Sequence, residues 1–305
     1  MIGTEQLILP DIFLAGTPKS GTTFLFDLLA QHAGINASNP KEPFYYVDDA
    51  CPYNQKSSLT AKRAYIDFYE GDSSELLLDG TSQTIYQDDI LKIIESASVK
   101  PRVIVVLRDP AKRILSSYGY TKHNIGAVKP TMQFEDYVGY LINEDYDSIR
   151  KHCRDEKAFY SLSNELDFSN YAKYLKRWKD AISEENLKVI LFEELMSNTQ
   201  HVLKEVLGFL GLSSIGFEPE SESKNETVAV KNGRLHYILY KLFGAVGYRL
   251  PFKAQVKKVY AKLQFGEKEN SNNEAALELL RIHFKPMRAE LRESFNLDLD
   301  RWWKD

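Results

Sequence analysis

A glycine-flanked loop near the amino terminus carries residues that suit anion binding. Residues 12–30 read IFLAGTPKSGTTFLFDLLA, which is an apolar run, a loop between Gly16 and Gly21, and a helical period that opens with two threonines. Backbone amides of such a loop, together with the N-terminus of the next helix, bind phosphate-like groups. Thr22 and Thr23 add hydroxyl donors at the same place. The segment therefore predicts a phosphate-binding strand, loop and helix.

The lysine of this loop stands in an unusual place. In the nucleotide triphosphatase loop, G-x-x-x-x-G-K-[ST], the lysine directly follows the second glycine. Here Thr22 follows Gly21, and Lys19 lies in the middle of the loop. A mid-loop lysine projects toward the far side of a diphosphate-like group. This position disfavours a kinase-like phosphotransferase with a P-loop.

A second apolar run, VIVVLRDP at 103–110, ends in a cation. A triphosphatase places a metal-binding acid at the end of such a strand. Here Arg108 comes first, and Asp109 and Pro110 follow it. Two cationic anchors without an obvious metal acid indicate a nucleotide that carries phosphate at two places, and we expect no metal.

A parallel sheet is needed to hold both anchors. Short apolar runs alternate with helical periods, and several of the runs lack the polar alternation of half-exposed strands. This order predicts an α/β three-layer fold with a central, mainly parallel sheet and a ligand crevice at the carboxyl ends of the strands. We expect a single domain over 1–305, helical from about 232 onward. The expected strands are 12–16, 35–38, 76–80, 103–108 and 187–192, and the expected helices are 22–32, 59–70, 88–98, 110–120, 171–182 and 199–211.

The two anchor motifs resemble those of the sulfotransferases that use 3′-phosphoadenosine 5′-phosphosulfate. The family loop G-x-x-K-[ST]-G-T-[ST] is met at 16–23, and R-[DN]-P-x-x-R-x-x-S-x-Y is met at 108–118. A third family stretch, a Y-x-x-x-L-x-x-W helix, a strand with an acidic end and an F-L-G-L turn, is met within 171–212. The resemblance covers roughly residues 10–305. It implies a P-loop-like sulfotransferase domain whose nucleotide product is 3′-phosphoadenosine 5′-phosphate.

The resemblance also implies a role for each anchor. The loop amides, Lys19 and the threonines hold the 5′-phosphosulfate, Arg108 and Ser116 clamp the 3′-phosphate, and Tyr171 lies on the adenine side. Sulfuryl transfer resembles phosphoryl transfer through a loose transition state, but the sulfuryl group carries less charge, so metal is not needed. Lys19 then stabilises the charge that builds on the bridging oxygen. The expected cofactor-binding residues are Thr17, Pro18, Lys19, Ser20, Gly21, Thr22, Thr23, Arg108, Ser116, Tyr171 and Lys231.

The acceptor, a hydroxyl or an amine, needs a base within hydrogen-bond reach. Glu42 lies in NPKEPFYY at 39–46, which resembles the K-E-P-x-[FY]-[FY] element of the saccharide and natural-product branches, where the glutamate takes the acceptor proton. His123 is the second candidate, since some heparan-type relatives carry a histidine at the corresponding helix end. Both residues remain candidate bases at this point.

The acceptor side departs from the family in places. Lys41, Phe44 and Tyr45 are expected to line it, with Lys41 steering the sulfate, but many relatives carry a histidine where Phe44 stands. In LLLDGTSQTIY at 76–86, Gly80 and Gln83 replace the usual lysine and proline. Acceptor contacts therefore do not carry over directly from relatives.

A basic stretch near the carboxyl terminus has three interpretations. Residues 231–262 contain no Asp or Glu but many Lys and Arg among apolar residues at helical spacing. A solvated helix face is the simplest interpretation. The alternatives are a lid over the anionic cofactor, which uses Lys231, and peripheral attachment to an anionic membrane surface.

Composition narrows the class of protein further. The chain has 305 residues, a formal net charge of -4 and two cysteines. This balance argues against a nucleic-acid partner, and the cysteines favour a reducing, cytoplasmic location. No run is long and apolar enough for stable membrane insertion.

We therefore expect a sulfotransferase that acts on a small-molecule metabolite, as in natural-product biosynthesis. A saccharide sulfotransferase and a nucleotide-binding module without turnover are the alternatives, and the oligomeric state is left open.

Overall fold

The computed structural model describes residues 8–54, 64–70, 75–220, 229–230, 265–266 and 273–303. The chain divides into two compact units. The first contains residues 1–109, 170–225 and 287–304, and the second contains residues 110–169, 226–286 and 305. The single domain expected over 1–305 stays a prediction.

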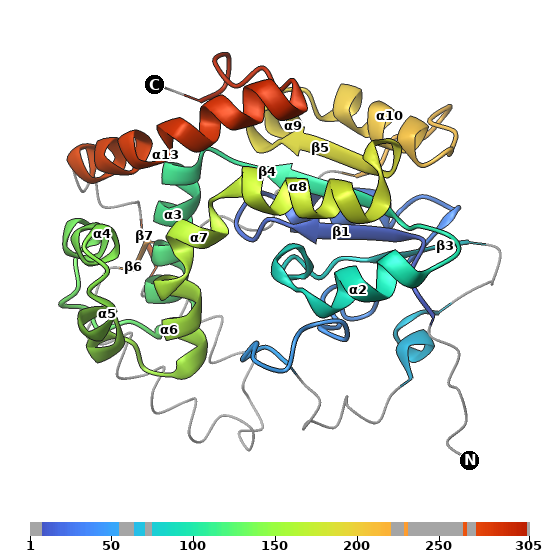
Figure 1. Cartoon of the computed structure of the whole chain (residues 1–305). Coiled ribbons are helices and arrows are strands. Elements are labelled where there is room, and N and C mark those ends of the chain that lie inside the picture. The colour runs from blue at the N-terminus through green and yellow to red at the C-terminus, as the bar shows by residue number, and fades with distance from the viewer. Residues whose placement is uncertain are drawn as a thin grey trace. The chain divides into compact units, whose positions relative to one another are not determined.

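A five-stranded sheet forms the centre of the first unit (Figure 1). Its spatial order is β2-β3-β1-β4-β5, and every pair of neighbours is parallel. The prediction of an α/β fold with a central, mainly parallel sheet is confirmed. Because β1 lies between β3 and β4, the loop that leaves its carboxyl end opens where ligands bind in such sheets. The strands are β1 (Ile12–Gly16), β2 (Ile35–Ala37), β3 (Leu76–Asp79), β4 (Arg102–Leu107) and β5 (Leu187–Leu191).

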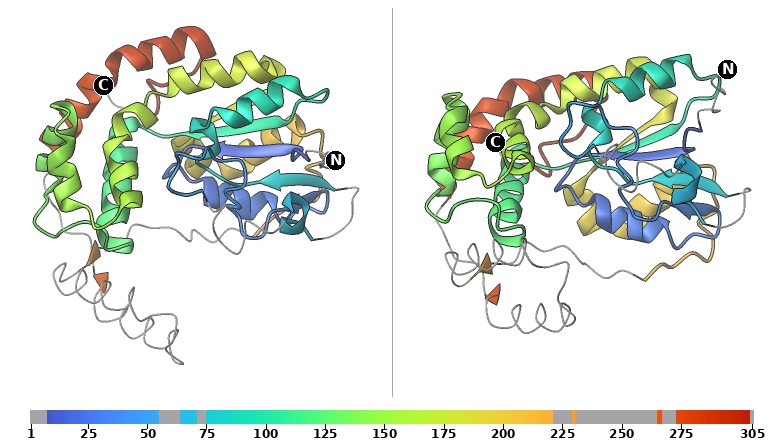
Figure 2. Two further views of the ribbon diagram at one scale, coloured as in Figure 1. Left: turned by 60° about the horizontal axis from the view of Figure 1, so that its bottom comes forward. Right: turned by 90° about the horizontal axis from the view of Figure 1, so that it is seen from below.

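Helices cover both faces of this sheet (Figure 2). Ile12 and Leu14 of β1 pack into one apolar core with α1 (Thr22–Leu29) and α10 (Thr199–Phe209). Phe13, between them, points to the other face and meets the ring of Trp178 on α8 (Tyr171–Ile182) edge-on. Both faces of the strand are thus buried, which explains why its sequence is apolar without alternation.

The remaining elements of the first unit are short. The expected helix at 59–70 is, in its described part, one 3₁₀ turn at Tyr65–Phe68. The hydroxyl of Tyr65 donates to buried Asp79, which ties this turn to the end of β3. The others are η3 (Thr84–Tyr86), α2 (Asp89–Ser96), η5 (Glu184–Asn186) and α9 (Phe192–Ser197).

The described residues of the second unit are mainly helical. Its first helix, α3 (Pro110–Gly119), runs directly into a π-helical turn at Tyr120–Asn124. Arg113 of α3 is buried within this unit, where it pairs with Glu165 and donates to the Ser169 hydroxyl. The other elements are α4 (Phe134–Ile142), α5 (Tyr146–His152), α6 (Glu156–Ser163), α7 (Glu165–Phe168), and the antiparallel β6 (Ala229–Val230) and β7 (Phe265–Gly266).

The described carboxyl-terminal residues, 273–303, consist mainly of one long helix. α13 (Glu274–Phe295) contains Pro286, and residues on the two sides of this proline belong to different units. The expectation of a helical carboxyl-terminal part is confirmed by this helix.

Candidate active site

The loop after β1 is built by its own hydroxyl groups. The backbone amide and the hydroxyl of Thr17 both donate to the carbonyl of Val106 on β4, at 2.9 and 3.1 Å. Because the hydroxyl proton of Thr17 is used there, the Ser20 hydroxyl donates to Thr17 Oγ1, at 2.7 Å. Both side chains are fully buried. Thr17 and Ser20 therefore shape the loop, and what they offer a ligand is backbone.

Gly21 closes the loop at the N-terminus of α1. Its φ of 84° lies in the left-handed region that favours glycine. A Cβ built there would meet Cδ2 of Phe192 at 2.7 Å. Thr22 and Thr23 follow as the first residues of α1, whose unpaired amides suit an anion. A compact glycine turn, a helix start and an adjacent lysine together fit a phosphosulfate group.

Lys19 and Arg108 meet at this loop. Lys19 has a φ of 68°, a left-handed conformation that is uncommon for a residue with a Cβ. Its carbonyl accepts a hydrogen bond of 3.0 Å from Nη1 of Arg108. The guanidinium of Arg108 also lies 4.6 Å from the centroid of the Phe192 ring. The structure therefore places the guanidinium of Arg108 against the backbone of Lys19, the residue that carries the other predicted cation.

Tyr171 supports Arg108 from the backbone side. Its buried hydroxyl donates to the carbonyl of Arg108, at 2.9 Å. This bond fixes the end of β4, and the contact between Tyr171 and adenine stays a prediction. The ring of Trp303 lies 6.1 Å from the ring of Tyr171.

A half-buried acid in the first turn of α9, just after β5, completes this support. One carboxylate oxygen of Glu193 accepts from the amide of Asp109 at 3.2 Å, and the other accepts from the indole of Trp303 at 3.1 Å. Burial raises the pKa of Glu193. Sequence reasoning noted an acidic strand end but missed Trp303, because nothing in the local sequence shows which residues the chain end will contact.

The candidate base Glu42 is held by three donors on one oxygen. Its Oε1 accepts from the Ser82 amide at 3.1 Å, from the Ser82 hydroxyl at 2.6 Å and from Lys41 Nζ at 3.3 Å. The Glu42 side chain is 32% exposed. A carboxylate that is fixed in direction and still reached by solvent is suited to take a proton from an acceptor. Ser82 was not among the predicted site residues.

The turn after β3, at residues 79–82, joins the segment that carries Glu42, at residues 41–44, to the sheet. Asp79 is buried, and its Oδ1 accepts from the Thr81 amide at 2.8 Å. Burial raises the pKa of Asp79, and hydrogen bonds from Thr81 and Tyr65 oppose that rise. The Gly80 amide of this turn donates to the Lys41 carbonyl of the Glu42 segment at 3.1 Å. Residues 79–82 and 41–44 are thus joined along their length.

Aromatic side chains lie beside the glutamate. Phe44, with a φ of 52°, donates its amide to Thr81 Oγ1 at 3.3 Å and stacks on Tyr53 with 5.5 Å between ring centroids. Tyr45 is 37% exposed and packs against Tyr46. These rings give the predicted acceptor side an apolar surface, which suits the flat face of a ring better than a highly charged chain.

Three of the predicted site residues are not in the described part of the first unit. Ser116 is on α3 and His123 is in the π-helical turn, both half-buried and both in the second unit. Their contacts with the cofactor and acceptor stay predictions. Lys231 lies outside the described residues, as does the whole basic stretch at 231–262.

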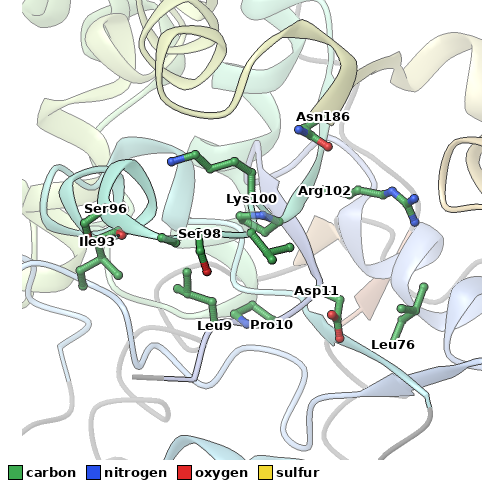
Figure 3. A pocket seen from close by; sticks show the side chains of 13 residues that line it. Leu9, Pro10, Asp11, Leu76, Ile93, Ser96, Ser98, Lys100, Arg102 and Asn186 are labelled. Carbon is green, nitrogen blue, oxygen red and sulfur yellow. Dashed lines mark hydrogen bonds between the residues drawn. The ribbon is translucent and has the colours of Figure 1, made fainter. Parts of the chain in front are cut away.

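A cavity of about 840 Å³ lies at the opposite edge of the sheet (Figure 3). Asp11, Arg102 and Asn186, at or just before the amino ends of three strands, contribute to its wall. Its ionic groups already have protein partners. Lys100 donates to the last carbonyls of α2, and Asp11 accepts from the Leu77 amide. We assign no chemistry to this cavity.

The described residues contain neither a membrane-spanning helix nor a cluster of metal ligands. No helix among them has the length and apolar character that crossing a bilayer requires. Within the same residues, no three His, Cys, Asp or Glu side chains are grouped as cation ligands.

Comparison with known proteins gives a family match across most of the chain. A family model described as "Sulfotransferase domain" matches residues 9–229. The chain is 23% identical to mouse bifunctional heparan sulfate N-deacetylase/N-sulfotransferase 4 over 67% of its length, and 23% identical to rat carbohydrate sulfotransferase 15 over 70%. It spans only 22% and 46% of the lengths of these two relatives.

A solved structure shares the fold. The crystal structure of a sulfotransferase from Alicyclobacillus acidocaldarius superposes with a TM-score of 0.61 at 20% identity, covering 97% of this chain and 99% of that one.

Proposed function

The chain belongs to the sulfotransferase family, and we propose that it transfers a sulfuryl group from 3′-phosphoadenosine 5′-phosphosulfate to a hydroxyl or amine of an acceptor. One observation carries this proposal. The Lys41 ammonium lies 3.5 Å from Thr22 Oγ1 at the glycine loop and 3.3 Å from Glu42 Oε1. A site for an anionic donor and a candidate base are therefore neighbours within one compact unit.

The residues of this unit divide the work of binding the donor. The loop amides and the threonines at the start of α1 hold the 5′-phosphosulfate, and Arg108 binds the 3′-phosphate. Lys19 donates to the oxygen that bridges phosphorus and sulfur, where negative charge develops during transfer. The hydrogen bond from Arg108 to the Lys19 carbonyl supports this role, because it fixes the backbone from which the amine projects.

Glu42 is the base of the proposal. It takes the proton of the acceptor while the amide and hydroxyl of Ser82 hold its Oε1, and it returns the proton to solvent after transfer. His123 stays the alternative base, from the second unit. In either case the fixed cations of the chain carry the charge stabilisation, and the proposal includes no metal.

The acceptor is a small metabolite with a hydroxyl or amine in our first proposal. A saccharide acceptor is the second candidate, and the names of the heparan sulfate and carbohydrate sulfotransferase relatives favour it. The stacked Phe44–Tyr53 pair supports either, since both sugars and aromatic metabolites present flat apolar faces.

A transfer assay tests the proposal. The protein is incubated with donor that carries radioactive sulfur and with a panel of small metabolites and oligosaccharides, and labelled products are identified by mass. We expect label in at least one acceptor, and loss of that label in Lys19→Met and Glu42→Gln. Nucleotide binding without any transfer would instead indicate a binding module without turnover.

A further inference from the structure

The side chain of Lys41 is unusually confined for a lysine near a surface. Its side chain is only 17% exposed, and Nζ donates to the Gly80 carbonyl at 2.9 Å, besides its contacts with Glu42 and Thr22. Lysine normally keeps its ammonium in water and its stem mobile. Here all three donors of the ammonium have acceptors, and those acceptors belong to three different segments of the first unit.

Gly80 makes room for this arrangement. A Cβ at position 80 would come within 2.8 Å of Cγ of Lys41 and within 2.6 Å of Cδ2 of Phe26. Gly80 is not among the glycines with positive φ, so its backbone does not demand glycine. The requirement is one of space: the absent side chain lets the stem of Lys41 pass between Gly80 and Phe26.

The position of the ammonium follows from the two groups that it joins. Thr22 begins the helix that holds the donor, and Glu42 accepts the proton of the acceptor. The sulfur atom must move from the first group to the second, so its three outer oxygens pass the ammonium. Coulomb attraction between the ammonium and the sulfuryl oxygens would be strong in a partly buried site, because water screens it little there.

We propose that Lys41 is a second catalytic cation, which exchanges its longest hydrogen bond, the one of 3.5 Å to Thr22, for the outer oxygens of the sulfuryl group during transfer, and that Gly80 is the residue that admits it. This inference rests on the proposed function. In the step, the bond from sulfur to the bridging oxygen breaks and its electron pair stays on the phosphate beside Lys19. A bond from sulfur to the acceptor oxygen or nitrogen forms, and the acceptor proton goes to Glu42. Lys41 keeps its protons throughout.

Two nucleotides that differ by the sulfuryl group test this role. The dissociation constants of 3′-phosphoadenosine 5′-phosphosulfate and of 3′-phosphoadenosine 5′-phosphate are measured without acceptor, by competition, for wild type, Lys41→Met and Gly80→Ala. A charged hydrogen bond to the sulfuryl oxygens predicts that Lys41→Met weakens the sulfated nucleotide about tenfold more than the desulfated one. Gly80→Ala displaces the same ammonium and should give a shift in the same direction.

The control is Lys92→Met, which removes an exposed lysine of α2 that pairs with Asp89. It should leave both constants and their ratio unchanged. Circular dichroism checks that each variant is folded, and Gly80→Ala provides the test if Lys41→Met does not fold.

Equal weakening of both nucleotides in the folded variants, or no weakening, would overturn the role of Lys41. Failure of the wild type to bind either nucleotide would instead overturn the proposed function itself.

Discussion

Arg108 donates a hydrogen bond of 3.0 Å from its guanidinium to the carbonyl of Lys19. The bond joins the end of β4 to the middle of the glycine loop, where Lys19 has a left-handed φ of 68°. Such a conformation at a non-glycine residue costs of order 1–3 kcal/mol and persists only when neighbours hold it. In the proposed function Arg108 therefore has two roles: it offers charge to the 3′-phosphate, and it holds the backbone of Lys19, which serves the 5′-phosphosulfate.

Removing Arg108 should therefore weaken nucleotide binding. Arg108→Ala loses a charged hydrogen bond to the 3′-phosphate and the support of the loop, and we expect affinity for 3′-phosphoadenosine 5′-phosphate to fall by about 10- to 100-fold in calorimetry. Arg150→Ala is the matched control, because Arg150 is exposed, and its contacts with Glu156 and the Phe159 ring lie at the surface of the second unit. An Arg108 variant that binds as the wild type does would separate this residue from the nucleotide.

Lys19 should matter more for transfer than for binding. Lys19→Met removes a donor aimed at charge that develops only in the transition state, so we expect kcat to fall by about 10²- to 10³-fold while affinity for the desulfated nucleotide changes much less. Steady-state rates and calorimetry on the same preparation measure both. If affinity and kcat fell together, Lys19 would be a binding residue.

Ser82 should matter for transfer and not for nucleotide binding. The Ser82 hydroxyl donates to Glu42 Oε1 at 2.6 Å, and the Ser82 amide donates to the same oxygen at 3.1 Å. Ser82→Ala removes the shorter bond and leaves the carboxylate less firmly positioned, so we expect kcat to fall by about tenfold in steady-state assays while calorimetry gives unchanged affinity for 3′-phosphoadenosine 5′-phosphate. An unchanged kcat in Ser82→Ala, together with loss of transfer in His123→Ala, would assign the base to His123.

Gly21 should tolerate no side chain. Gly21→Ala combines a φ of 84° with a Cβ that would meet Phe192 at 2.7 Å, and we expect a loss of about 1–3 kcal/mol in unfolding free energy together with loss of nucleotide binding. Gly139→Ala is the control. Gly139 is in α4 and a Cβ there meets nothing within 4 Å, so alanine should stabilise the helix by about 0.5–1 kcal/mol. Thermal and urea unfolding measure both.

Asp79 should make stability depend on pH in an unusual direction. Burial raises its pKa above 3.8, so the native state keeps a proton that the unfolded state releases. This contribution lowers the unfolding free energy as pH rises from 3.8 toward the raised native value. Asp79→Asn removes the titration, so the unfolding free energy of the variant relative to wild type should increase across that window. Urea titrations at several pH values give this difference, and a constant difference would contradict it.

The positions of the strands were largely predictable from the sequence. The run at 103–108 is apolar because both faces of β4 are covered, and the observed strand Arg102–Leu107 differs by one residue at each end. The place of the glycine loop was also predictable, since the spacing of its glycines alone predicts an anion site. Local patterns carry this information because it depends on neighbours in the chain.

Contacts between distant segments were not predictable in the same way. Ser82 and Trp303 act through residues far away in sequence: the Ser82 hydroxyl reaches Glu42, and the Trp303 indole reaches Glu193. In the sequence Gly80 is a departure from the family pattern, while the structure shows the space that it leaves for Lys41. The type of a residue does not indicate which distant residue the folded chain brings into contact with it.

The proposed binding of a nucleotide with two phosphate groups by the glycine loop and Arg108 is tested most directly by one calorimetric titration. 3′-Phosphoadenosine 5′-phosphate is titrated into the full chain in a buffer that contains a metal chelator. We expect saturable binding of one nucleotide per chain, and much weaker binding of adenosine 5′-monophosphate, which lacks the 3′-phosphate. No heat from either nucleotide with folded protein, or equal affinity for both, would contradict the account.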